Sequence, residues 1–415
     1  MKQIAQFFTL YWIIYFPTCI AYNDLPGFSS VDEVMTGILV IYTFMKKGHR
    51  SLNKKPWKEY YQFIYILLFF TAYGLLWGRN VSGGVWLDFI QELRPFSIIY
   101  CTWILNPQLS RRQKRLMLGA RVVTLFSWIF DHPESAQVLE TGVRAEFPVL
   151  GQLAICSGMS WYLLTKDTKN NRYIALALVL TGMLAPKFKF LGEVVCFIYL
   201  LFFLQKRFNF KSYMTVAYIS ILMSVVLYVT WERFDMYYVT GLNTEVSGRM
   251  ARPETYKTAI QILWDYFPLG SGMGSFACNG AWRYYSPLYH EYNLDTVWGL
   301  DRGGGFICDA YYPTLAQFGV VGLFFFIVFW RRRLIAMNKI RDMRYYRVAF
   351  MTFFCLAIEQ TADSSWLSGK GMGYCMLLAL CLNANRNMGL TDSGKVRPSM
   401  AEIEEKKESQ EEVKV

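Results

Sequence analysis

The hydrophobic positions of this chain come in long runs that short polar stretches interrupt, with little regular alternation between the two kinds of residue. Each run has roughly fifteen to twenty residues, about the length of helix that crosses the hydrocarbon core of a bilayer. Backbone groups in lipid must bond within their own segment, so the runs predict an all-α, polytopic membrane helix bundle, and the missing alternation argues against a barrel. We expect about twelve spans, near residues 3–22, 33–45, 59–77, 83–106, 114–130, 148–165, 171–186, 190–205, 213–231, 309–330, 347–362 and 366–384.

The polar stretches between the runs alternate in charge. Five are basic, among them "KKGHRSLNKKPWK" and "RRRLIAMNKIRDMRYYR", whereas "NDLPGFSSVDE", "DHPESAQVLETGVRAEF" and "TADSS" are neutral or acidic. Because positive loops stay on the cytoplasmic side, we expect both termini to be cytoplasmic and the first span to be retained. The net charge of +12 then reflects orientation in the membrane and calls for no nucleic-acid partner.

The pattern divides the chain into two parts. Residues 1–384 form the expected helical domain, which includes an external, periplasmic loop at 232–308 that is far longer than a usual connection. Residues 385–415 are polar and of mixed charge, and we expect a disordered cytoplasmic tail. The external loop is apolar enough to fold, and it contains a predicted amphipathic helix with an apolar face of Tyr256, Ile260, Leu263, Trp264 and Phe267.

Five of the cations on the predicted external side are candidate site residues. Lys187 and Lys189 lie in the turn between the seventh and eighth spans, Arg144 lies in an earlier external stretch, and Arg249 and Arg252 bracket the start of the loop helix. Charges near hydrocarbon often mark a site, and guanidinium groups beside a helix N-terminus suit phosphate oxygens. For either lysine alone, contact with lipid phosphates at the membrane surface is the competing interpretation.

Glu92, Arg94 and Glu193 are ionisable residues at or near the expected membrane depth. Structural ion pairs would explain them, and so would a water-accessible cavity between the helices. The cysteines fall mostly within apolar runs without a C-x-x-C motif or a histidine cluster, and no outward Asp-x-Asp pair is present. We therefore expect no disulfide framework, no metal and no cofactor.

The last third of the chain carries distinctive motifs. "SGRMARPETYKTAIQILWDYFPLGSGMGSF" is followed by "CDAYYPTLAQFGVVGLFFF", so an arginine precedes a loop helix, a P-x-G-x-G-x-x-S-F turn comes next, and a polar-aromatic segment leads into an apolar run with a G-x-x-G step. This arrangement resembles the bacterial O-antigen and capsule polymerase and O-antigen ligase superfamily. The resemblance implies transfer of a glycan from an undecaprenyl-pyrophosphate carrier to an acceptor sugar at the outer face of the cytoplasmic membrane.

The polymerase branch fits this sequence better than the ligase branch. Ligases typically carry a histidine just before the span that follows the loop, and this chain has Cys308 and Asp309 there, followed by Tyr311 and Tyr312. The resemblance implies a lipid-linked oligosaccharide as substrate, a bilayer environment, and a chain-length regulator and a flippase as partners. Tyr311 and Tyr312 are expected to bind substrate.

The implied chemistry joins a sugar hydroxyl to an anomeric carbon while lipid pyrophosphate leaves. Pyrophosphate is a good leaving group, so it needs cations that stabilise its charge more than it needs an acid that protonates it. Arg249 is the first candidate for this catalytic cation. The other expected substrate ligands are Arg252, Lys187, Lys189, Arg144 and Arg94. Asp309 is the first choice of base and Glu193 the second, in a reaction that uses no metal.

Two other functions stay open at this point. A ligase would pass finished chains to a lipid A core. A flippase or secondary transporter of lipid-linked glycans would instead place its cations around a cavity reached from both sides, and the large folded loop argues against it.

Overall fold

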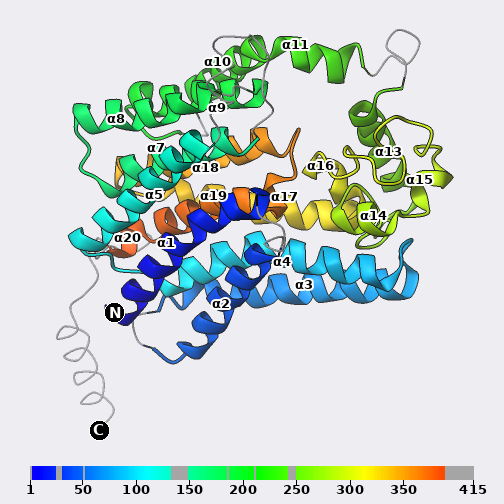
Figure 1. The fold of residues 1–415 in the computed structure, drawn as a ribbon, viewed down its shortest axis with the longest axis horizontal. Helices are drawn as coiled ribbons and strands as arrows, with labels where there is room; N and C mark the ends of the chain where they lie inside the picture. Colours follow the sequence, from blue (N-terminus) through cyan, green and yellow to red (C-terminus); the bar gives the residue numbers. More distant parts are fainter. Residues whose placement is uncertain are drawn as a thin grey trace.

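The computed structural model describes residues 2–24, 30–49, 52–131, 148–184, 187–209, 212–241 and 249–387. Within these ranges the secondary structure is entirely helical, and no strand occurs (Figure 1). The prediction of an all-α protein is confirmed. Arg144 lies outside the described residues, as does the tail from residue 388 onwards.

In the part of the chain that the structure describes, a helix lies at each hydrophobic run. The bounds are α1 Lys2–Asp24, α2 Val31–Met45, α3 Lys55–Trp77, α4 Ser82–Leu105, α5 Arg111–Asp131, α7 Pro148–Leu164, α8 Lys169–Leu180, α9 Phe188–Ile198, α10 Tyr213–Val229, α17 Gly319–Asn338, α18 Met343–Glu359 and α19 Gly369–Leu382. The long loop contributes the helix α13 Ala251–Asp265, and short helices connect or extend the others: α11 Trp231–Phe234, α14 Asn279–Tyr284, α15 Leu288–Glu291, α16 Tyr311–Thr314 and α20 Ala384–Asn387.

Two helical segments of the described chain are long and apolar enough to cross a membrane: Lys55–Trp77 and Tyr311–Asn338. Many of the others are shorter, and α4 carries Asp88, Glu92 and Arg94 in its middle. The twelve expected spans therefore remain a prediction, although a helix lies at every one of them.

Local sequence fixes several helix ends. Asp342 begins α18, where its carboxylate accepts a hydrogen bond from the Arg344 backbone N–H at 2.8 Å. Thr168 does the same for α8, accepting from Asn171 N–H at 3.3 Å. Asn106 ends α4 in the left-handed conformation, which asparagine adopts more readily than most residues. Polar residues between the apolar runs thus act as stop and start signals.

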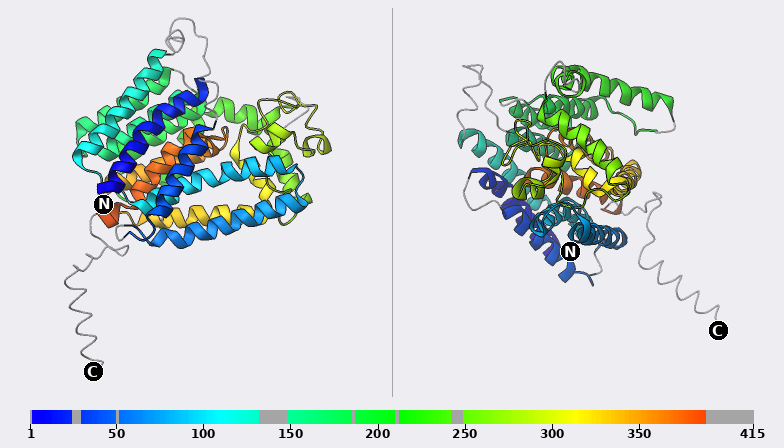
Figure 2. Two further views of the ribbon diagram at one scale, coloured as in Figure 1. Left: turned by 60° about the horizontal axis from the view of Figure 1, so that its bottom comes forward. Right: turned by 90° about the vertical axis from the view of Figure 1, so that its right-hand side faces the viewer.

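Helix α4 lies at the centre of the bundle. Its second half is almost wholly buried, and α2, α3 and α19 pack around it. Helices α7 to α10 form a layer on one side of the bundle, and the segment containing α13, α14 and α15 gathers at one end of α3 and α4 (Figures 1 and 2). This segment has a hydrophobic core of its own, made of Ile262, Phe276, Leu288, Tyr289, Leu294, Leu300 and Ile307 among others. The prediction that the long loop folds is confirmed for residues 249–308.

The loop helix α13 forms as predicted, but three of the five residues of its predicted apolar face are exposed. Its buried positions include Ala251, Thr255, Thr258, Ala259 and Ile262. The bulky residues Ile260, Trp264 and Phe267 are 59%, 73% and 63% exposed. Small side chains allow α13 to pack closely on α16 and the turn after it, and this close approach leaves the larger side chains outside.

Candidate functional site

A group of polar side chains lies where the folded loop meets the bundle. Lys189, in the first turn of α9, donates to Glu359 Oε2 and to Asp363 Oδ2, both at 2.6 Å. Gln152 on α7 donates to the same Glu359 oxygen at 2.8 Å, and the Ser365 hydroxyl does so at 3.0 Å. Glu359 is therefore surrounded by donors, and Lys189 and Asp363 extend the network towards the loop.

Glu193 lies one helical turn after Lys189 and is fully buried. Among the described residues, no hydrogen-bond partner reaches either of its carboxylate oxygens. The charged groups that act on it are Glu359, Lys189 and Asp363. Burial of a carboxyl group without hydrogen-bond partners costs folding free energy. The position of Glu193 beside a charged network therefore indicates a functional site rather than ordinary core packing.

A second ion pair joins the loop to this network. Arg252 on α13 donates from Nε to Asp309 Oδ2 at 2.8 Å and also from Nη2, and its guanidinium stacks on the Tyr237 ring at 4.2 Å from the centroid. The charges of Asp363 and Lys189 act on Asp309, which places both ion pairs in one site. We call the six residues Glu193, Lys189, Glu359, Asp363, Arg252 and Asp309 the junction cluster.

The pKa values of the second pair reflect a site that is partly shielded from water. Burial raises the pKa of Asp309 above its ordinary value of 3.8, although the charge and hydrogen bonds of Arg252 oppose this rise. Burial lowers the pKa of Arg252, but Asp309 more than compensates and the net change is upward. Asp309 therefore keeps a proton more readily than an exposed aspartate does, as a general base requires.

Three tyrosine hydroxyls donate hydrogen bonds to backbone carbonyls at the same junction. The hydroxyls of Tyr238 and Tyr256 both donate to the Thr361 carbonyl at 2.9 Å, and Tyr312 donates to the Ala357 carbonyl at 3.1 Å. Tyr311 points the other way, into the bundle, where its hydroxyl donates to Glu92 at 3.1 Å. Of the two tyrosines predicted to bind substrate, Tyr312 thus lies on the junction side and Tyr311 in the core.

Other residues expected at the site have different surroundings. Arg249 donates to Glu254 Oε2 and, through Nη1, to the Asn293 carbonyl at 2.8 Å and the Thr296 hydroxyl at 2.9 Å. Its guanidinium therefore ties the loop together, whereas that of Arg252 faces Asp309. Lys187 is half-buried directly before α9, two residues from Lys189.

Arg94 belongs to a separate buried network. It pairs with Asp32 and Glu33 of α2 and donates to the Leu367 carbonyl at 2.6 Å. Of the two interpretations of this residue, structural ion pairing is the one that its contacts favour.

The glycine turn is packed against the bundle by its backbone. Gly272 and Gly274 have φ of +93° and +79°, and a Cβ atom on Gly272 would lie 2.5 Å from the Gly78 Cα. The Gly274 N–H donates to Gln317 Oε1 at 2.8 Å, and Gln317 donates to the buried Asp88 at 2.7 Å. Glycine is required there because any side chain would meet backbone, so the turn anchors the loop against α3 and α4.

Glu359 and Asp363 were not among the residues expected at the site. Glu359 is the last residue of α18, and Asp363 follows it four residues later in "AIEQTADSS", beyond the end of the helix. The two cations of the junction cluster consequently have carboxylate partners. The cluster holds four acidic groups against Lys189 and Arg252, so it can position hydroxyl groups and accept a proton as well as meet an anion.

The described residues contain no group of three or more His, Cys, Asp or Glu residues arranged to hold a metal ion. A comparison of the sequence with models of known protein families gives no match, and a comparison with curated proteins gives none either. The junction cluster and the sequence motifs that flank it are therefore the features that bear on function.

Proposed function

We propose that the chain is an integral-membrane glycosyltransferase of the O-antigen and capsule polymerase type. It would transfer a glycan from undecaprenyl pyrophosphate to the acceptor sugar of a lipid-linked repeat unit. The observation that carries the proposal is the Arg252–Asp309 pair beside the Lys189–Glu359–Asp363 network. Both residues lie within the two stretches that resemble the superfamily, although the arginine of the family pattern is Arg249, and they meet at the base of the folded loop.

In the proposed reaction, the donor pyrophosphate takes the place of Asp309 on the Arg252 guanidinium. A guanidinium forms bidentate bonds to phosphate as it does to carboxylate, so the exchange conserves its hydrogen bonds. Asp309 is then free to accept the proton of the attacking hydroxyl. The sugar O–H bond breaks, a new bond forms to the anomeric carbon, and the electron pair of the old C–O bond leaves with the pyrophosphate.

The other members of the junction cluster have positioning roles in this proposal. Lys189 forms ion pairs with Glu359 and Asp363 and would hold both carboxylates in position. Glu193, one helical turn after Lys189, is the second candidate for the base. Lys187 would meet the outer phosphate of the carrier. Arg249 holds the loop rather than the phosphate.

The membrane setting is part of the proposal. Helices α3 and α17 are apolar enough to span, and basic residues gather at the start of α3 and the end of α17. The positive-inside rule then puts that end and both termini in the cytoplasm, and the junction cluster at the periplasmic face of the inner membrane.

The experiment is complementation of a deletion strain, with the length distribution of its glycan as the readout. Arg252→Ala should reduce chain elongation by about 10²–10³-fold, whereas Arg283→Ala, in the last turn of α14, is the matched control and should elongate normally. Arg252→Lys should rescue in part, because an ammonium group lacks the bidentate geometry.

Each product pattern has a different meaning. Single repeat units on the acceptor in the deletion strain support a polymerase. Long chains that accumulate on the undecaprenyl carrier would identify a ligase instead, and lipid-linked units trapped on the cytoplasmic side would identify a flippase. Normal polymer from a well-expressed Arg252→Ala protein would remove Arg252 from the mechanism.

A further inference from the structure

An apolar groove of about 640 Å³ lies between α17 and α18. It is walled mainly by Phe326, Ile327, Trp330, Leu334 and Phe353. Ile327 and the neighbouring Ile335 are 56% and 46% exposed, so the groove opens on the outside of the bundle. In a membrane, this opening faces acyl chains, and the groove has the shape and lining of a lipid site.

One end of the groove is strongly basic. Arg331 and Lys339 line its lower part together with Asn338. Asn338 also lines an adjoining hollow of about 510 Å³, in which Lys206 and Arg207 lie. We call Arg331, Lys339, Lys206 and Arg207 the basic quartet. In the described part of the chain, no carboxylate forms an ion pair with any of the four.

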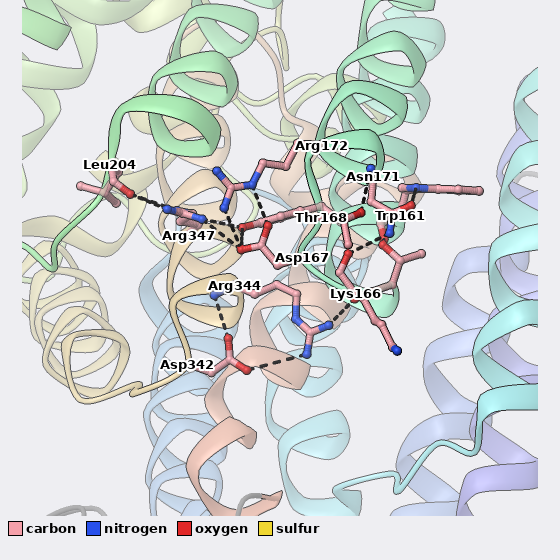
Figure 3. Close-up of polar contacts among 12 residues, drawn as sticks. Trp161, Lys166, Asp167, Thr168, Asn171, Arg172, Leu204, Asp342, Arg344 and Arg347 are labelled. Carbon is pink, nitrogen blue, oxygen red and sulfur yellow. Dashed lines mark hydrogen bonds and ion pairs between the residues drawn. The ribbon is translucent and has the colours of Figure 1, made fainter.

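Buried contacts hold the segment that carries Lys206 and Arg207. The side chain of Arg347 on α18 is 7% exposed, and it donates to the Leu204 carbonyl from Nε at 3.0 Å and from Nη2 at 2.8 Å. Figure 3 shows this arginine between Leu204 and Asp167, which it also meets at 3.3 Å. The chain is therefore fixed immediately before the two cations.

A second chain of hydrogen bonds fixes the segment on its other side. The backbone N–H of Phe208 donates to the Tyr346 hydroxyl at 2.8 Å, and this hydroxyl donates to Asn338 Oδ1 at 3.2 Å. Asn338 is the residue that the groove and the basic hollow share. The arrangement makes one continuous surface from two different stretches of sequence.

The groove on the opposite side of α17 gives a contrast. It lies between α3 and α17 and has a volume of about 550 Å³, with a similarly apolar lining. Its charged end is compensated in part, because Arg333 pairs with Glu59, whereas Arg332 donates to the neutral Gln62 at 3.4 Å. The α17–α18 groove differs in that four cations gather at its end, with no ion-paired carboxylate among the described residues.

We propose that the α17–α18 groove binds an anionic phospholipid of the inner leaflet, with its acyl chain along the groove and its phosphate at the basic quartet. Each cation near an anionic headgroup adds to the attraction, and apolar contacts with the aromatic walls add burial of the chain. The proposal rests on the proposed membrane setting, and its test needs no transferase activity. The basic quartet lies at one end of the groove, and the other end reaches Tyr312, Ala357 and Gln360 beside the junction cluster.

The experiment is native mass spectrometry of the full-length protein in a neutral detergent, titrated with phosphatidylglycerol or with phosphatidylcholine. The wild type should retain phosphatidylglycerol and release phosphatidylcholine. Replacing the quartet by glutamine (K206Q, R207Q, R331Q and K339Q together) should lower retention by at least about tenfold. Arg332→Gln is the matched control, since it removes a neighbouring charge on the other side of α17, and it should retain the lipid as the wild type does.

A second variant tests the groove without changing charge. Leu334→Trp fills the groove wall beside the basic quartet and should also reduce retention, even if the quadruple variant fails to fold. Equal retention of the two phospholipids, or full retention by a folded quartet variant, would overturn the proposal. Retention of undecaprenyl phosphate in preference to phosphatidylglycerol would assign the groove to the carrier lipid and would likewise overturn it.

Discussion

Lys189 offers the sharpest test of the junction cluster, because two carboxylates depend on one ammonium group. Its side chain is 11% exposed, and those of Glu359 and Asp363 are 2% and 18% exposed, so water can replace little of the lost interaction. Removing one partner from a buried ion pair typically costs about 3–5 kcal/mol, since a charge is left uncompensated. Lys189→Met should therefore lower the free energy of unfolding by at least about 3 kcal/mol.

A double variant separates the ion pair from simple packing. Glu359→Gln keeps an oxygen that can accept from Gln152 and Ser365, but it removes the charge that Lys189 neutralises. Adding it to Lys189→Met should restore part of the stability, with a coupling energy of about 1–3 kcal/mol. Lys169→Gln, an exposed lysine at the start of α8, is the control and should change stability by less than about 0.5 kcal/mol.

Equilibrium unfolding in mixed micelles, followed by tryptophan fluorescence, measures these differences. The same proteins should be assayed for chain elongation at saturating and limiting donor. If Lys189 binds pyrophosphate directly, as its place in the sequence suggested, Lys189→Met would raise the Michaelis constant at unchanged stability. That result, together with additive effects in the double variant, would refute the pairing.

Three further predictions concern the loop and the basic end of the bundle. If Asp309 is the base, Asp309→Asn should lose turnover by about a hundredfold or more. Activity needs the ionised form of Asp309, and the charge of Arg252 lowers the pKa of Asp309. In Arg252→Gln, the acid limb of the pH–rate profile should therefore move to higher pH. An unmoved acid limb would contradict the role of Asp309 as the base. Arg249→Ala should cost about 1–3 kcal/mol and expose the loop to proteolysis, and a protein that resists protease as the wild type does would contradict its tying role. Burial raises the pKa of Asp167, but hydrogen bonds and charges from Arg172 and other neighbours outweigh burial, and the net shift of the pKa is downward. The stabilisation by Asp167 is therefore present above about pH 4 and is lost below that pH. In unfolding curves measured at acid pH, the stability difference between wild type and Asp167→Asn should shrink below about pH 4, and a pH-independent difference would contradict this prediction.

The helices could be predicted from the sequence because their signal is local. Long apolar runs, polar interruptions and turn residues such as Asn106 are read within a few positions of each other, and a helix lies at each expected run. The folding of the long loop was predictable for the same reason. The buried face of α13 was not, because hydrophobicity favoured Trp264 and Ile260, whereas the fold needed the small residues for close packing.

The candidate site was predictable only in part. Arg252 and Lys189 were identified as cations on the external side, Glu193 as a charge within an apolar run, and Asp309 through the family resemblance. The structure brings these four residues together. Their counter-charges were not identified, since Glu359 lies 170 positions from Lys189 and pairing over that separation leaves no periodic trace. The cations alone therefore predicted a site that binds anions. Glu359 at the end of α18 and Asp363 after it pair with Lys189 and make the site acidic as well as basic.

The end of α18 explains how a loop with its own core can be aligned with a site in the bundle. The last carbonyls of a helix lack partners within the helix, and here donors from the loop segment take them. The Gln360 carbonyl accepts from the Tyr311 backbone N–H at 3.1 Å, and the Thr361 carbonyl accepts from Tyr238 and Tyr256. Because the same short stretch carries Glu359 and Asp363, the groups that dock the loop also set the distance between its Arg252–Asp309 pair and the carboxylates of the bundle. Backbone docking thus makes the geometry of the junction cluster a consequence of where α18 ends.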